Sequence, residues 1–265
     1  MAEGLNPQFD PGLLSRIEDA GLNASAPPQQ RWMDGWLVRY SPGKARRARC
    51  INAVAAGRLP LDRQLAAVAA VYRDAGLQLV LRITPFTQPA TLNAELAARG
   101  WATVDDTRVM VCADLAAVPA QPLPPGCKLE ALAAAAYAQL VGGWRGSSVE
   151  AIAAHAERMA LSPVPYSGFV LRQHGRPLAC GQFVVEGDLV GLYDVFTAVP
   201  ARGHGLARVL CAQLLARAQA SGAKSGYLQV EADNAPARAV YHRLGFTDGY
   251  GYRYRVAPEA TAAVS

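Results

Sequence analysis

Residues 199–210 read VPARGHGLARVL and place two glycines directly before a segment with helical periodicity. Apolar residues recur every three or four positions from Leu206 onward, which predicts a helix that runs to about residue 220. The first peptide N–H groups of a helix have no intrahelical acceptor, and Gly203 and Gly205 leave these groups open to a ligand. The stretch therefore predicts an anion-binding helix N-terminus, with a plain tight turn as the alternative interpretation.

Strands are predicted on both sides of this helix. Segments rich in β-branched and aromatic residues, bounded by turn sequences, occupy residues 166–173, 176–186, 188–199, 225–232 and 250–257. Helical periodicity begins at residue 129 and is expected to end near Gly142, and it also occupies residues 149–161 and 235–245. This order of elements predicts an α/β (α+β) domain built on a central sheet.

The N-terminal half repeats this plan in outline. Strand patterns occupy residues 35–41, 46–54, 77–83 and 107–115, and helical patterns occupy residues 61–76 and 90–100. Val54 is separated from Gly100 by as many residues as Val199 is from Gly245. The equal spacing favours a tandem duplication over two unrelated α/β layers.

A proline-rich segment at residues 119–127 predicts the domain boundary, because proline removes backbone donors and stiffens the chain. The sequence thus predicts an N-terminal domain of residues 1–118, a linker of residues 119–127 and a C-terminal domain of residues 128–265.

Composition bounds the function classes. The 265 residues are 51% hydrophobic and carry a formal net charge of +5, which suits an anionic ligand but is too diffuse to indicate nucleic acid. The basic run at residues 43–50 is interpreted as a solvated edge strand. The sequence lacks the patterns of a signal peptide and of a transmembrane helix, so we expect a cytoplasmic protein without a membrane partner.

Cysteines and histidines are scattered along the chain without metal-ligand spacing. The five cysteines lie in apolar or strand-like segments, and we interpret them as buried reduced thiols. No HExxH helix or zinc finger is present, and no metal site is expected.

Two motifs of the C-terminal half resemble the GNAT superfamily of N-acyltransferases. VPARGHGLA resembles the acyl-CoA signature Arg/Gln-x-x-Gly-x-Gly/Ala, with Arg202, Gly205 and Ala207 at the defining positions. NAPARAVYHRLGF resembles the second motif, with these residues in register: Asn234, Ala237, Tyr241, Gly245 and Phe246. The resemblance covers about residues 128–257. The N-terminal half resembles, in layout only, the degenerate repeat of tandem GNAT proteins such as mycothiol synthase, which implies two GNAT-like domains with mixed, mostly antiparallel sheets flanked by helices.

The resemblance implies acetyl-CoA as the cosubstrate and coenzyme A as a product. It places the pyrophosphate on the amides at the helix start, and the pantetheine arm as an extra strand that enters a V-shaped splay between the strands at 188–199 and 225–232. The cofactor-binding residues that it implies are Val195, Phe196, Thr197, Arg202, Gly203, His204, Gly205, Leu206, Ala207, Asn234, Ala237 and Tyr241.

Acetyl transfer to an amine requires a neutral nucleophile, a stabilised oxyanion and a proton for the departing thiolate. By the family pattern Tyr241 is the acid, and its alternative role is that of a core tyrosine packed against Phe246. For the base, Glu231, Asp194 and a water chain all remain open, and either carboxylate could instead be a salt-bridge partner. The region where the family binds acceptors contains Trp144, Arg145 and Tyr166, which could equally be core residues.

These inferences predict an N-acetyltransferase that moves the acetyl group of acetyl-CoA to a primary amine of a small molecule or peptide by direct attack in a ternary complex. It is expected to act as a monomer or homodimer, without nucleic acid. Two alternatives remain open: a catalytically silent acyl-CoA-binding sensor, and a protein- or ribosome-associated lysine or N-terminal acetyltransferase.

Overall fold

The computed structural model describes residues 4–41 and 46–258. Backbone contacts divide the chain into two compact units, and neither is a continuous stretch of sequence. Unit 1 contains Pro27–Thr107 and the C-terminal segment from Tyr250, and unit 2 contains Leu5–Ala26 and Arg108–Gly249. The division into continuous domains at residues 119–127 stays a prediction.

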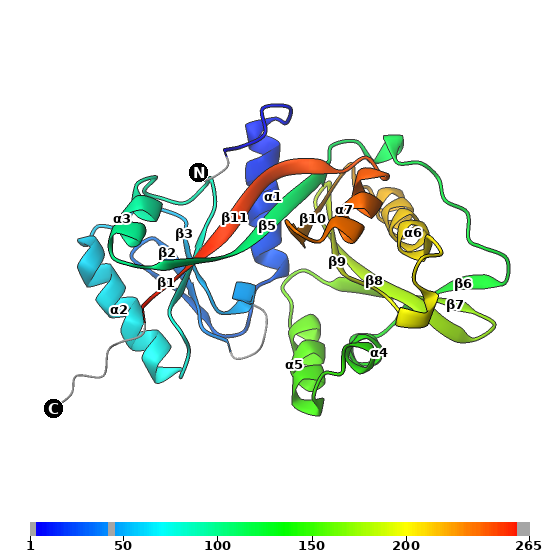
Figure 1. Ribbon diagram of the computed structural model, residues 1–265, viewed down its shortest axis with the longest axis horizontal. Helices are drawn as coiled ribbons and strands as arrows, with labels where there is room; N and C mark the ends of the chain where they lie inside the picture. Colours follow the sequence, from blue (N-terminus) through cyan, green and yellow to red (C-terminus); the bar gives the residue numbers. More distant parts are fainter. Residues whose placement is uncertain (1–3, 42–45, 259–265) are drawn as a thin grey trace. The chain divides into compact units, whose positions relative to one another are not determined.

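Unit 2 is built on a sheet with the strand order β5-β10-β9-β8-β7-β6 (Figure 1). Its strands are β6 (Cys127–Leu132), β7 (Tyr166–Gln173), β8 (Arg176–Glu186), β9 (Leu189–Thr197), β10 (Ser225–Glu231) and the C-terminal end of β5 (Ala102–Cys112). Neighbouring strands from β6 to β9 are antiparallel, whereas β10 runs parallel to β9. A parallel pair needs a crossover, and α6 (Leu206–Ala220) supplies it.

The two faces of this sheet carry different helices. On one face α6 packs on β8 and β9, and α7 (Ala235–His242) packs against the same hydrophobic cluster, which includes Phe183 and Leu192. On the other face lie α1 (Pro11–Ala24), α4 (Ala134–Arg145) and α5 (Val149–Ala160), against residues such as Cys180 and Tyr227. Side-chain alternation along each strand separates the two sets, as in the neighbours Cys180 and Gly181 of β8.

Close packing of α6 depends on Gly181. A Cβ atom at this position would lie 3.1 Å from Leu214 and 3.3 Å from Leu210, so the glycine lets the helix approach the strand. Both leucines are fully buried, and each such burial stabilises the fold by about 1.5–3 kcal/mol. The start of α6 is thereby fixed relative to β8 and β9.

Unit 1 has the strand order β1-β2-β3-β4-β11. Its elements are β1 (Gln30–Met33), β2 (Trp36–Arg39), β3 (Ile51–Ala53), α2 (Leu61–Asp74), β4 (Val80–Ile83), α3 (Leu92–Ala98) and the C-terminal end of β11 (Thr247–Val256). The strands β3 and β4 are parallel and are joined by α2, as β9 and β10 are joined by α6. Aligning Gly100 with Gly245 also aligns Leu61 with Leu206, the first residues of the two helices.

Two segments differ from the sequence-based expectations, and a third cannot be compared. The helix predicted from residue 129 begins only at Ala134, because residues 127–132 form the edge strand β6 paired with β7. The strand predicted at residues 46–54 is confined to Ile51–Ala53, since Arg46–Ala48 form a 3₁₀ turn. Residues 43–45 of the basic run lie outside the described residues.

Two elements near the start of the chain were not predicted. The helix α1 begins after Asp10, whose carboxylate accepts a hydrogen bond from the amide of Leu13, and Pro11 occupies the first helical position. An aspartate followed by a proline is a recognisable helix start, so the sequence did carry this signal. The exposed strand β1 is only four residues long and lacks apolar alternation.

Candidate active site

The start of α6 is reached through a short 3₁₀ turn, Val199–Ala201, that follows β9. We call residues 202–207 the glycine loop. Gly203 and Gly205 adopt φ values of 82° and 72°, in the left-handed region that favours glycine. A Cβ atom at either position would meet no atom within 4 Å, so backbone conformation rather than crowding requires these glycines, and the space around them is open.

Most backbone donors of this loop have no acceptor in the described part of the chain, the exception being the amide of Arg202, which donates to the carbonyl of Val199. Within the residues that the structure describes, the amides of residues 203–207 donate to no acceptor, and the first helical hydrogen bonds come from Arg208 and Val209 to the carbonyl of Gly205. The helix dipole adds a partial positive charge at the same end. The glycine loop can therefore bind an anion through several parallel N–H groups.

Beside the loop, β9 leaves its parallel partner. Pairing of β9 with β10 ends at Leu192 and Leu228. The last residues of β9 stay paired with β8, where Phe196 lies opposite Cys180 and Thr197 opposite Ala179. Among the described residues, one backbone edge of β9 thus has no partner strand over the segment where the resemblance places the pantetheine arm.

Asp194 lies at an irregularity of β9. The register with β8 shifts between Cys180 and Gln182, and Asp194 has a φ of 50°. An extra residue in a strand turns two successive side chains to the same face. The carboxylate of Asp194 therefore reaches the face that is covered by α4 and α5.

Three side chains surround this carboxylate. Arg145 Nη1 lies 3.1 Å from Oδ1, and His155 Nε2 and Gln182 Nε2 each lie 3.0 Å from Oδ2. The hydroxyl of Tyr137 donates to the Asp194 carbonyl at 2.8 Å. One residue thus ties α4, α5 and β8 to the end of β9.

The ionisation of Asp194 is set by these neighbours. Burial disfavours the charged carboxylate, but His155 and Arg145 outweigh this effect and hold the pKa of Asp194 well below its usual range. A carboxylate that is ionised, hydrogen-bonded to Arg145 and Gln182, in contact with His155 and low in pKa accepts protons poorly. Its geometry suits an anchor more than a general base.

The side-chain oxygens of Tyr241 and Glu231 have no hydrogen-bond or ion-pair partner within the described residues. The Tyr241 ring packs edge-on against Phe246, with 6.2 Å between the centroids, while its hydroxyl makes no hydrogen bond within the described residues. Burial, with a contribution from Cys211, raises the pKa of Tyr241, so the phenol is protonated at neutral pH. Glu231 is the exposed last residue of β10, and it pairs with no cation in the described part of the chain.

The other predicted site residues occupy defined positions. Trp144 stacks on Phe196 with 5.9 Å between the centroids, and the guanidinium of Arg202 lies 5.5 Å from the same ring. Tyr166 donates its hydroxyl to the carbonyl of Ala24 in α1. Asn234 caps α7 by accepting a hydrogen bond from the amide of Ala237 at 3.2 Å.

Trp144 and Arg145 therefore lie together beside the end of β9, whereas Tyr166 lies beside Tyr193 on the same face of the sheet. Sequence reasoning missed His155 and Gln182. His155 is an isolated histidine in a helix, and Gln182 is one polar residue in a strand, so no local pattern marks either of them.

A cavity of about 800 Å³ adjoins the glycine loop. Its lining includes His204 and Leu206 of the loop, Trp144 of α4, and Gln173 and Arg176 of the β7–β8 hairpin. This volume lies in the range of small-molecule sites. The open amides of the loop therefore adjoin a space large enough for a ligand.

The described residues contain no group of three or more histidine, cysteine or acidic side chains able to hold a metal ion. Within the same residues, none of the helices has the length and apolarity that crossing a membrane requires. The five cysteines form no disulfide, and four of them are buried.

Comparison with known proteins adds to this geometry. Residues 132–246 match the acetyltransferase (GNAT) family. A search of curated proteins finds no match. Among solved structures, a GCN5-related N-acetyltransferase from Kribbella flavida is similar with a TM-score of 0.69 and 17% identity, over 96% of this chain and 99% of that chain.

Two further solved structures are similar. A tandem GNAT protein from the clavulanic acid biosynthesis pathway has a TM-score of 0.60 and 16% identity, over 77% of this chain and 72% of that chain. A GCN5-related N-acetyltransferase from Sphaerobacter thermophilus has a TM-score of 0.57 and 16% identity, over 74% and 66% of the two chains. These similarities confirm the fold class predicted from the sequence.

Proposed function

We propose that unit 2, whose residues 132–246 match the acetyltransferase (GNAT) family, transfers the acetyl group of acetyl-CoA to a primary amine. The row of free amides at residues 203–207 carries this proposal. A diphosphate offers the negative charge and the several acceptor oxygens that such a row can bind. The residues present thus fit the pyrophosphate of coenzyme A.

The unpaired edge of β9 supports the placement of the pantetheine arm. Its amide and carbonyl groups can bind an extended ligand in the way that a sheet edge binds a strand. Val195, Phe196 and Thr197 supply this edge, and their side chains need not be polar. A ligand bound in this way runs from the glycine loop toward the end of β10, where Glu231 lies.

We assign the proton transfers to side chains whose oxygens are not already hydrogen-bonded. Tyr241, protonated at neutral pH, is the proposed acid that protonates the departing thiolate. Glu231 is the proposed base, directly or through water. Its help matters most for a strong amine: deprotonation at pH 7 costs about 4.6 kcal/mol for a lysine-like amine but about 1.4 kcal/mol for an α-amine.

Asp194 receives a different role. Its carboxylate is already bonded and low in pKa, so we assign it to holding Arg145 and His155 in place. Trp144 and Arg145, the proposed acceptor-site residues on α4, depend on this anchor for their position. Tyr166 is kept as a proposed part of the acceptor wall, through its ring rather than its bonded hydroxyl.

The test is a screen of small-molecule and peptide amines with acetyl-CoA, read by thiol release and by mass spectrometry of the products. Acetylation of a primary amine with release of one thiol per product is the expected result. Acetyl-CoA binding without thiol release from any amine would instead indicate a silent sensor. Products confined to protein lysines or N-termini would favour a protein acetyltransferase.

A further inference from the structure

The loop before α2 in unit 1 corresponds to the glycine loop of unit 2. Both loops connect a strand to the helix that crosses over to its parallel neighbour. With Leu61 aligned to Leu206, the amides of Arg58 and Leu59 take the places of the amides of Gly203 and His204. The two loops can therefore be compared amide by amide.

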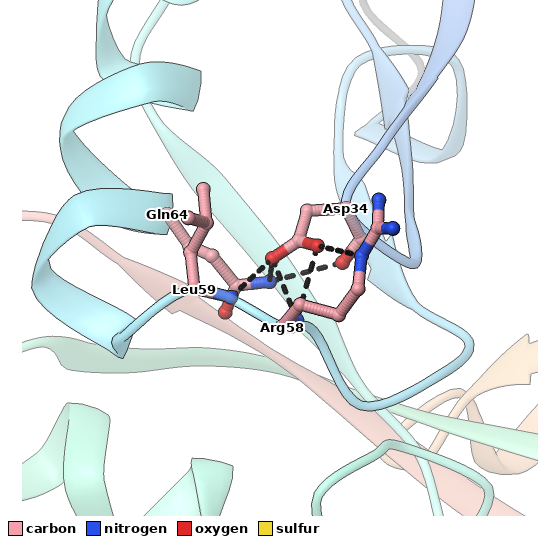
Figure 2. A network of polar contacts seen from close by, with 4 residues as sticks. All are labelled: Asp34, Arg58, Leu59 and Gln64. Carbon is pink, nitrogen blue, oxygen red and sulfur yellow. Dashed lines mark hydrogen bonds and ion pairs between the residues drawn. The ribbon is translucent and has the colours of Figure 1, made fainter.

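In unit 1 these amides are already occupied. Figure 2 shows the carboxylate of Asp34 seated on them, with the amide of Arg58 donating to Oδ1 at 3.0 Å and to Oδ2 at 2.9 Å. The amide of Leu59 donates to Oδ2 at 2.9 Å, and Gln64 Nε2 donates to the same oxygen at 3.0 Å. The carboxylate thus occupies the place of an external anion.

The surrounding chain is shaped around this carboxylate. Asp34 has a φ of 44° in the turn between β1 and β2, although it is not a glycine. A Cβ atom on Gly57 would lie 2.6 Å from Asp34 Oδ2 and 1.8 Å from Gln64 Nε2, so any other residue there would have to displace these two side chains. The side chain of Asp34 is only 14% exposed.

Electrostatics keep the carboxylate ionised. The amides of Leu59 and Arg58, together with the Arg58 guanidinium, hold the pKa of Asp34 below its ordinary value. In unit 1 the negative charge at the start of α2 therefore belongs to the chain itself.

Unit 2 differs at the corresponding turn. The β7–β8 hairpin turns through His174 and Gly175 with φ values of 49° and 80°, close to the values of 44° and 84° for Asp34 and Gly35. The ring of His174 lies against Gly126, where a Cβ atom would be 2.9 Å away. The same backbone turn thus presents no carboxylate, and a cavity opens between this hairpin and the glycine loop.

We propose that Asp34 is a built-in anion. Its carboxylate fills the anion seat, formed by the amides of Arg58 and Leu59 before α2, and so holds the β1–β2 turn against the loop before α2 in place of a ligand phosphate. The contacts that place Asp34 in this seat all lie within unit 1. Only its comparison with a phosphate site rests on the function proposed for unit 2. Pro60, which has no N–H group, and Asp62 stand at the positions of Gly205 and Ala207 and further disfavour an external phosphate.

The test is rescue by an added carboxylate. Asp34→Ala empties the seat, and its melting temperature should fall by about 2 °C or more. Sodium formate should raise this temperature more than sodium chloride at equal ionic strength, because formate can occupy the vacated seat. Asp74→Ala is the matched control, since Asp74 lies exposed at the opposite end of α2, and its response to the two salts should equal that of the wild type.

If the alanine variant does not fold, Asp34→Asn is the second variant that tests the proposal. It keeps the side-chain volume but removes the charge, so it should melt below the wild type and gain nothing extra from formate. Wild-type melting temperatures for both variants, or a folded alanine variant that responds equally to formate and chloride, would overturn the proposal. The assay contains no acetyl-CoA, so its outcome is separate from that of the proposed acetyl transfer.

Discussion

Single residues of unit 2 differ in whether their polar atoms are already bonded. The carboxylate of Asp194 has three close partners, whereas the hydroxyl of Tyr241 and the carboxylate of Glu231 have none within the described residues. A group that exchanges a proton with a substrate needs an open atom, so the chemistry is assigned to the second pair. Asp194 is instead assigned to positioning the side chains around it.

Tyr241→Phe tests the proposed acid. Removal of a positioned acid lowers turnover by about a hundredfold or more, while acetyl-CoA affinity changes little, because the phenyl ring still packs on Phe246. Initial-rate kinetics and calorimetry measure the two quantities. Tyr40→Phe, in unit 1, is the control and should keep the wild-type rate. Equal turnover of both variants would return Tyr241 to the role of a core residue.

Asp194→Asn tests the anchor through stability and pH. At pH 7 the variant leaves Arg145 and His155 without their anion, and because Arg145 is partly exposed we expect the unfolding free energy to fall by about 1–2 kcal/mol. Because the folded pKa is lowered, this stabilisation is fully present above the ordinary aspartate pKa of about 3.9 and is lost as the pH falls toward the folded value. The difference between the two proteins should therefore shrink at acidic pH.

Urea unfolding at a series of pH values measures this difference. Asp74→Asn, at the exposed end of α2, provides the control and should follow the wild type at every pH. A constant difference between the wild type and Asp194→Asn across the acidic range would show that the carboxylate charge is not the source of the stabilisation.

At the scale of elements, local patterns predicted the strands β7 and β8 and the helix α6 with their observed bounds. Strand alternation, turn residues and helix caps act within a few residues, so they can be read from sequence. The sequence predicts helix for residues of the edge strand β6, because the pairing of this strand with β7 is a contact distant in sequence. The bulge at Asp194 and its approach to His155 depend on tertiary packing in the same way.

Two glycines with different surroundings test the packing of α6 on β8. Gly181→Ala adds a methyl group 3.1 Å from Leu214, and overpacking of this kind should lower the unfolding free energy by about 1–3 kcal/mol. Gly143→Ala, inside α4 with no atom within 4 Å of its new Cβ, should raise stability by up to about 1 kcal/mol. Chemical denaturation of both variants checks the opposite signs. Equal effects would mean that Gly181 is not needed for helix approach.

For the whole molecule, the two units repeat one plan but differ at the helix start. The glycine loop of unit 2 has open amides, whereas the corresponding amides of unit 1 hold Asp34. Each compact unit also contains an element from the far end of the chain: α1 belongs to unit 2, and the end of β11 belongs to unit 1. A fragment that ends near residue 120 would lack the end of β11, so the intact chain is the proper object for binding experiments.

The intact chain should bind one equivalent of acetyl-CoA. Gly205→Glu places a side chain and a negative charge in the proposed phosphate seat, and should weaken binding about a hundredfold or more, equivalent to about 2.7 kcal/mol. Gly76→Glu is the matched control, because Gly76 is also exposed, has a φ of 65° and has open space around it. Calorimetry should therefore give a stoichiometry near one for the wild type and for Gly76→Glu, and no strong site for Gly205→Glu. Two equivalents per chain, or a site of wild-type affinity that survives in Gly205→Glu, would show that the seat held by Asp34 does not exclude the cofactor from unit 1.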